Sequence, residues 1–185
     1  MRYMIAPVYS MEEIRRATSS LGRRLWMMYG QAAPVIVVVA EGGIPFSEML
    51  MDQMRRHGWD KPDVLTVKAR SYQGTKRGPL SLTWRDKPTN IWSRDVLIVE
   101  DIIDSGTTVK TIEDALRMMG ANDVQVASVL QRYSTPTSAR YHSLFNIDDD
   151  AFMVGFGLDH DGKFRELEGV YEYTPEESLD KAKPV

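Results

Sequence analysis

Apolar residues recur at helical spacing after Ser10, close to the start of the chain. Ser10 and Glu13 have the S-x-x-E spacing of a capping box, in which each side chain accepts a hydrogen bond from the other residue's backbone amide. The stripe that follows ends before Gly30 and consists of Ile14, Ala17, Leu21, Leu25 and Met28. This pattern predicts an amphipathic helix over residues 11–29.

Four predominantly apolar runs follow, at residues 35–40, 64–69, 96–99 and 124–130. Such runs are typical of strands that are covered on both faces, as in parallel sheets. Helical stripes separate the first run from the second and the third from the fourth; they are Phe46, Met49, Leu50 and Met54, then Val109, Ile112, Leu116 and Met119 before Gly120. This alternation predicts a doubly wound α/β fold with right-handed crossovers.

The periodicity disappears between Arg70 and Asn90. Turn-forming residues punctuate this stretch, namely Gly74, Gly78, Pro79 and Pro88. We expect an irregular or hairpin excursion here, and loops of this length in compact domains are usually functional or disordered.

Length and composition narrow the class of protein. With 185 residues, 43% of them hydrophobic, the chain suits one globular domain or a domain with a small appendage. Its 26 acidic and 23 basic residues give a net charge of −3 without a basic run, which argues against a nucleic-acid partner.

Features missing from the sequence limit the cellular compartment and the kinds of metal site that we expect. The absence of cysteine excludes disulfides and thiolate metal sites, and the three histidines have no zinc-site spacing. We find no pattern of a signal peptide or membrane span, so we expect a cytoplasmic protein without a membrane partner.

The sequence VLIVEDIIDSGTT at residues 96–108 carries the most chemical information. Residues 104–108 offer hydroxyls, a glycine and free amides at a helix N-terminus, which together suit a phosphate group. Glu100 and Asp101 add hard oxygen ligands for ribose hydroxyls or magnesium. The structural alternative is that these two acids are solvated and that Ser105 is an ordinary helix cap.

This segment resembles the phosphoribosyl-pyrophosphate motif of type I phosphoribosyltransferases, especially that of the hypoxanthine-guanine enzymes. Ser71 and Tyr72 resemble the Ser-Tyr pair of the family's mobile loop. Residues 152–159, FMVGFGLD, resemble the family's purine-binding segment. Residues 164–167, FREL, resemble the characteristic segment that follows it in the family. The likeness covers roughly residues 34–171.

The resemblance implies roles for the residues of the central motif. Asp104 would act near the purine N7 as general base or proton relay, the alternative being a cap of the phosphate loop. The 5-phosphate would bind to Ser105, Gly106, Thr107 and Thr108. Glu100 and Asp101 would orient the ribose hydroxyls and the magnesium shell.

It also implies roles for the second half of the chain. Phe152 would stack on the purine and the Met153 backbone would contact the base edge, although an aromatic residue in an apolar strand is more often core. Asp159 would help to bind the base and a second magnesium. Arg165 would contact pyrophosphate, although a lone arginine is usually a surface charge.

Two positions depart from the family pattern. The pyrophosphate loop of the family commonly contains Leu-Lys-Gly-Gly, whereas this chain has Glu41 and Gly42 after Ala40. We expect the Glu41 side chain to point away or to act only through its amide, and a non-proline cis bond before it would support the resemblance. Arg132 falls near the family lysine that donates to the purine 6-oxo group, and an arginine fork is not equivalent to an ammonium group.

The resemblance implies a single phosphoribosyltransferase domain over residues 1–185. Its fold would be a twisted, mainly parallel sheet flanked by helices, with a core at about 30–132 and a small hood from the N-terminal segment and about 133–175. Residues 171–185, rich in Glu, Lys and Pro, are predicted to form a C-terminal extension.

The resemblance also implies substrates and an assembly. The substrates would be phosphoribosyl pyrophosphate and hypoxanthine, guanine or xanthine, with Mg2+ as cofactor, and the assembly would be a homodimer or homotetramer. Two alternatives are transfer to another base, and a catalytically silent regulatory protein that senses nucleotides.

Overall fold

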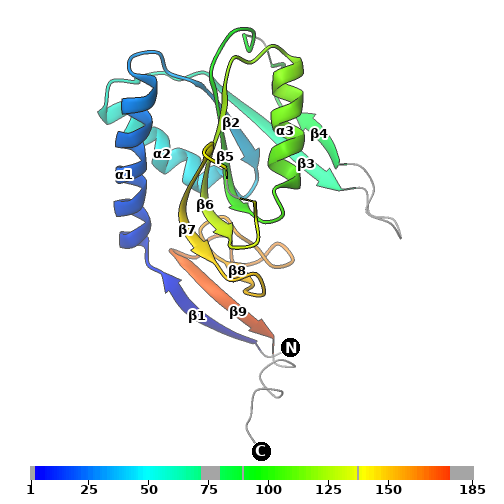
Figure 1. The fold of residues 1–185 in the computed structure, drawn as a ribbon. Coiled ribbons are helices and arrows are strands. Elements are labelled where there is room, and N and C mark those ends of the chain that lie inside the picture. Colours follow the sequence, from blue (N-terminus) through cyan, green and yellow to red (C-terminus); the bar gives the residue numbers. More distant parts are fainter. Residues whose placement is uncertain (1–2, 72–79, 89, 137, 176–185) are drawn as a thin grey trace, which may run out of the picture.

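The computed structural model describes residues 3–71, 80–88, 90–136 and 138–175. Figure 1 shows a large sheet between helices and a smaller sheet beyond one end of it. The helices are α1 (Met11–Tyr29), α2 (Ile44–Arg56) and α3 (Thr107–Met118). The strands are β1 (Tyr3–Tyr9), β2 (Val35–Ala40), β3 (Val64–Ser71), β4 (Leu80–Trp84), β5 (Val96–Ile103), β6 (Val124–Arg132), β7 (Tyr141–Ile147), β8 (Met153–Val154) and β9 (Val170–Pro175).

The large sheet has six strands in the order β4-β3-β2-β5-β6-β7. Only β4 is antiparallel to its neighbour, so the predicted mainly parallel α/β sheet is confirmed. In the stretch after Arg70, β4 pairs antiparallel with β3, as the hairpin alternative requires, and residues 72–79 lie outside the described residues. Strand β5 lies at the centre, which places its carboxyl end at the middle of the sheet edge.

Alternate residues of the central strands face two separate cores. Ile36 and Val38 of β2 pack with α1 and α2, whereas Val35, Val37 and Val39 pack with α3 on the opposite face. Helix coverage of both faces explains why these strands are continuously apolar. The predicted helix over residues 11–29 is α1, with the Ser10–Glu13 capping box formed.

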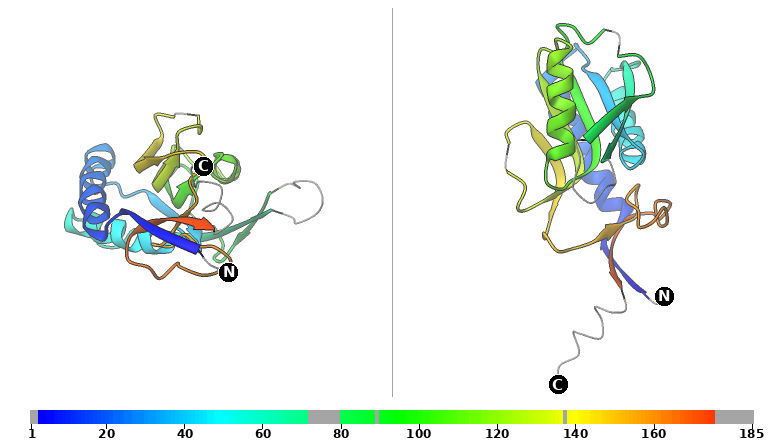
Figure 2. Two further views of the ribbon diagram at one scale, coloured as in Figure 1. Left: turned by 90° about the horizontal axis from the view of Figure 1, so that it is seen from below. Right: turned by 90° about the vertical axis from the view of Figure 1, so that its right-hand side faces the viewer.

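The small sheet has the order β1-β9-β8, and we call it, with the loop between β8 and β9, the hood. It lies beyond the carboxyl ends of the parallel strands (Figures 1 and 2). Residues 171–175, expected as part of a C-terminal extension, instead form most of β9 and pair with β1. Strand β7, which lies in the range expected for the hood, belongs to the large sheet.

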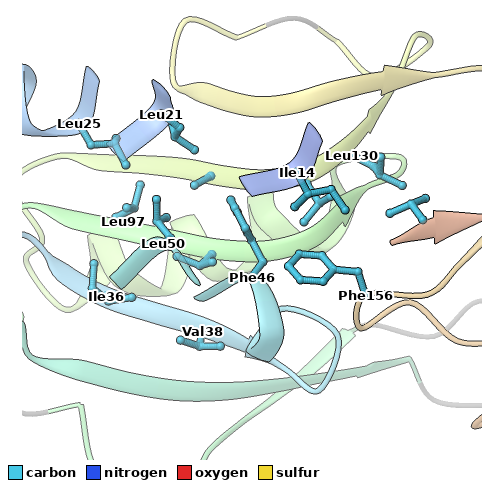
Figure 3. Packing of buried hydrophobic residues seen from close by; sticks show 14 of the residues in the cluster. Ile14, Leu21, Leu25, Ile36, Val38, Phe46, Leu50, Leu97, Leu130 and Phe156 are labelled. Carbon is cyan, nitrogen blue, oxygen red and sulfur yellow. The ribbon is translucent and has the colours of Figure 1, made fainter. Parts of the chain in front are cut away.

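One hydrophobic core joins the two parts. Figure 3 shows Phe156 of the hood loop beside Ile14 of α1 and Phe46 of α2, all of which are buried. This contact fixes the hood loop over the sheet edge where β2 and β5 end. Within the described residues, no helix has the length and apolarity needed to cross a membrane.

Candidate active site

The loop between β5 and α3 forms a small cradle at the carboxyl end of the central strand. Its cavity of about 100 Å³ is lined by residues 102–109. Gly106, at the N-cap of α3, has φ 76°, a left-handed conformation that favours glycine. The Ser105 and Thr107 hydroxyls lie 2.9 Å apart, beside the first-turn amides that have no partner within the helix. Hydroxyls, amides and the helix dipole together can bind a phosphate group.

Thr135, which the sequence analysis did not identify, supports this cradle from the loop after β6. Its buried hydroxyl donates to the carbonyl oxygens of Ile103 (3.1 Å) and Asp104. Its methyl group would lie 3.7 Å from a Cβ at position 106. A single threonine after a strand has no pattern that would have revealed this role.

Glu100 and Asp101 lie within β5, because the strand continues to Ile103 rather than ending at Val99. Glu100 is only 6% exposed and is therefore not a solvated acid. Burial raises the pKa of Glu100 well above its ordinary value, and the Asp101 carboxylate adds to the rise. No Lys, Arg or His of the described segments forms a salt bridge with either acid. This pair of carboxylates would be stabilised by a cation.

The loop that follows β2 closes against these acids. The peptide bond between Ala40 and Glu41 is cis. A Cβ at Gly42 would lie 1.8 Å from Oδ2 of Asp101, and one at Gly157 would lie 2.1 Å from the Gly42 carbonyl oxygen. Two glycines thus allow this loop, β5 and the hood loop to meet at one point.

The Glu41 side chain points toward β3 rather than into this meeting point. Its Oε1 accepts a hydrogen bond from Nζ of Lys68 at 2.7 Å. The pKa of Glu41 is lowered mainly by this hydrogen bond from Lys68, and next by the positive charge of the same ammonium group.

In the hood loop, Asp159 is already engaged with its neighbours. Its Oδ1 lies 2.6 Å from Nη2 of Arg165, and its Oδ2 accepts from the amide of Gly162. Arg165 also donates to the carbonyl of Gly157, so it is tied into the loop rather than being an isolated surface charge.

Phe152 lies just before β8, and Met153 is the first residue of that strand. The Phe152 side chain is 43% exposed, so it is not a core residue, whereas Met153 is buried. The Phe152 ring contacts His160 (5.2 Å between ring centroids) and Tyr173 (5.8 Å), both edge-on. These two edge-on contacts leave part of Phe152 exposed.

Arg132 connects the cradle to the loop before β8. Its Nε donates to Asp104, and its Nη1 donates to the carbonyls of Asp148, Asp149 and Ala151 at 2.9–3.0 Å. The structure therefore brings Asp104 and Arg132 into direct contact. Ser71 is the last residue of β3, and Tyr72 lies outside the described residues.

The loop at residues 104–108 follows two acids at the carboxyl end of a central parallel strand, which is where ligands bind in α/β proteins with open sheets. A model of the phosphoribosyl transferase domain matches residues 9–161. The chain belongs to the phosphoribosyltransferase family.

Individual relatives agree with this assignment. The hypoxanthine-guanine phosphoribosyltransferase of Streptococcus pyogenes is 34% identical over 165 residues, which cover 86% of this chain and 88% of that protein. The Streptococcus agalactiae enzyme of the same name is 35% identical over 170 residues, with the same coverage of both chains.

Solved structures of similar proteins share the fold. The crystal structure of a Bacillus anthracis hypoxanthine-guanine phosphoribosyltransferase has a TM-score of 0.79 and 25% identity, covering 94% of this chain and 100% of that chain. A Trypanosoma cruzi hypoxanthine phosphoribosyltransferase in complex with the product IMP has a TM-score of 0.79 and 26% identity, covering 92% of this chain and 94% of that chain. The predicted family is confirmed.

Proposed function

We propose that this protein is a purine salvage enzyme that transfers ribose 5-phosphate from phosphoribosyl pyrophosphate to a 6-oxopurine. Hypoxanthine and guanine are the expected acceptors, with xanthine as a third. The observation that supports this proposal most directly is the cradle at residues 104–108 beside the Glu100–Asp101 pair, facing a hood with a half-exposed Phe152. Relatives named for these bases agree with it.

The reaction exchanges one bond at the anomeric carbon of the ribose. The C1′–oxygen bond breaks and pyrophosphate leaves with the electron pair, through an oxocarbenium-like state, while the purine ring nitrogen forms the new bond to C1′. The base loses a proton in this step. We expect Asp104 to accept this proton or to relay it, and its 66% exposed carboxylate, held by Arg132, supports that role.

Each remaining residue binds or orients a substrate. The amides and hydroxyls of residues 105–108 hold the 5-phosphate, and Phe152 stacks on the base whose edge contacts the Met153 backbone. Arg165 and the Gly42 loop contact the pyrophosphate group. Asp159 contacts the base, and we expect the Arg165–Asp159 pair to loosen when both substrates are bound.

Magnesium is the expected cofactor, and the donor set fits it. The described residues contain no group of three or more His, Cys, Asp or Glu that could hold a metal alone. Magnesium usually binds through one or two carboxylates together with substrate phosphates, which matches the Glu100–Asp101 pair. The ion would neutralise charge on the pyrophosphate group, and Asp159 would be the ligand of a second ion. We also propose a homodimer or homotetramer, as the family resemblance implies.

The experiment is a panel of bases assayed with phosphoribosyl pyrophosphate and magnesium. We expect nucleoside monophosphates from hypoxanthine and guanine, and little product from adenine or uracil. Asp104→Asn should lower kcat by about 10²- to 10⁴-fold, the usual contribution of a general base, while IMP binding is retained. Asp52→Asn on α2, which removes a carboxylate from a surface pair, serves as the control.

The regulatory alternative gives a different result. A nucleotide sensor would bind IMP or GMP tightly but would show no turnover in the wild type. Absence of turnover with all three 6-oxopurines would contradict the proposed function, and turnover with only a pyrimidine would assign another acceptor.

A further inference from the structure

A second cavity lies beside the loop at Ala40–Gly43, on the side away from the phosphate cradle. Its volume is about 230 Å³, and its lining residues are Ala40, Glu41, Thr66, Lys68, Thr83 and Arg85. The strand register places Lys68 between Ala40 of β2 and Thr83 of β4. The cavity therefore lies where β2 ends beside β3, and it adjoins the loop expected to contact pyrophosphate.

The lining of this cavity suits an anion with several oxygen atoms. Lys68 and Arg85 supply two cationic groups, and Thr66 and Thr83 supply two hydroxyl donors. Cationic side chains and hydroxyls are the groups that bind phosphate oxygens in proteins. Among the described residues that line the cavity, Glu41 is the only acid, and it lies 2.7 Å from the Lys68 ammonium group.

Glu41 takes the place that an anionic ligand would take. Besides Lys68, the charges of Arg165 and Arg85 also favour its ionised form and lower its pKa. The Glu41 and Lys68 side chains are 53% and 38% exposed, so their ion pair is weak and can be exchanged for another partner. Where the resembling family carries a lysine in its pyrophosphate loop, this chain has an acid in the loop and a lysine on the next strand.

We propose that Lys68 and Arg85 form an accessory pocket for the pyrophosphate group, and that the Glu41 carboxylate is a built-in counter-anion that the incoming group displaces from Lys68. This inference rests on the proposed function, because it assumes that pyrophosphate is a reaction partner. It makes Glu41 a residue that weakens pyrophosphate binding and thereby favours release of the product. Lys68 supplies the positive charge that the loop itself lacks.

The test is a calorimetric titration of inorganic pyrophosphate, with magnesium present, into the full chain and its variants. Glu41→Gln should tighten pyrophosphate binding by about two- to fivefold, the range expected when one exposed ion pair no longer competes. Lys68→Gln should weaken binding, and in the Lys68→Gln background Glu41→Gln should no longer tighten it. The gain should shrink as salt is added.

Matched controls separate the pocket from general electrostatics. Glu48→Gln on the exposed side of α2 removes the same charge and should leave pyrophosphate affinity unchanged. IMP, whose phosphate is expected in the cradle at residues 104–108, should bind equally well to the wild type and to Glu41→Gln. An equal gain for IMP, or a gain that persists without Lys68, would overturn the inference.

The base panel is evaluated separately from these titrations. A wild type that turns over a 6-oxopurine while Glu41→Gln binds pyrophosphate as the wild type does would overturn the pocket and leave the proposed function standing. A wild type without turnover would contradict the function on its own.

Discussion

Arg132 holds two loops of the site together through one guanidinium group. It was expected to donate to the base, but its Nε and Nη1 are directed to Asp104 and to three backbone carbonyls. A family pattern can predict a hydrogen-bond donor at this position. It cannot predict the partners of an arginine fork, because they lie far apart in the sequence. The expected contact of Arg132 with the base stays a prediction, and its contacts within the protein could not be predicted from the sequence.

Arg132→Lys is therefore expected to be a damaging substitution. An ammonium group cannot reproduce the fork, and the Arg132 side chain is only 16% exposed. Loss of these charged hydrogen bonds should cost about 1.5–3 kcal/mol of unfolding free energy. It should also lower kcat, because Asp104 loses its orientation.

Urea denaturation and steady-state kinetics measure the two effects. Arg140→Lys is the control, because Arg140 is 44% exposed and forms ordinary surface pairs with Glu113 and Asp123. If Arg132→Lys behaved like Arg140→Lys in both measurements, Arg132 would not be the link between the two loops.

Among the elements, the central strands of the large sheet were predictable, whereas β1, β7 and β9 were not. The apolar runs of β2 and β6 identify strands covered on both faces. β7 lies at the edge of the large sheet and has the mixed sequence YHSLFNI, whereas β1 (YMIAPVY) and β9 (VYEYTP) belong to the small sheet. Polar residues interrupt β7 and β9, and Pro7 falls inside β1, so none of the three has the β-branched run that marks β2.

The contact between the hood loop and the Gly42 loop depends on the absence of a side chain at Gly157. Gly157→Ala should lower the free energy of unfolding by about 1–2 kcal/mol, because alanine is strained at a φ of 100°. The clash of the new methyl group with the Gly42 carbonyl should lower it by about 1–3 kcal/mol more. Gly58 has the same φ of 100° with nothing within 4 Å, so Gly58→Ala isolates the conformational part. Equal destabilisation of the two variants in urea would show that the close contact does not matter.

The pairing of β6 with β7 includes a titratable side chain. His142 Nε2 lies 3.0 Å from Oε1 of Gln125, and burial, with a smaller contribution from Arg24, lowers the pKa of His142 below 6.5. Below pH 6.5 the unfolded chain therefore binds a proton that the folded protein resists, so stability falls as pH falls.

His142→Asn should remove this part of the acid sensitivity. Because the ring is only half-buried, the effect should be a few tenths of a kcal/mol between pH 7 and pH 5. Thermal unfolding of both proteins across this range measures it. A difference between variant and wild type that does not change with pH would contradict the assignment.

In the whole molecule, the site exists only where the two sheets meet. The central motif was predictable because strand, acids, loop and helix start are consecutive in the chain. The hood joins β1 and β9 from opposite ends of the described residues, and its loop is placed by Phe156 in the shared core. Such long-range pairing leaves no local pattern in the sequence. For the same reason, the contacts of Thr135, Lys68 and His160 with distant residues could be found only in the structure.

A crystal structure of the protein with bound IMP would test the cradle and the purine contact together. We expect the phosphate within hydrogen-bonding distance of the amides of residues 105–108, and the purine stacked on Phe152. A phosphate bound elsewhere, with the cradle free and the Phe152 ring uncovered, would contradict the account.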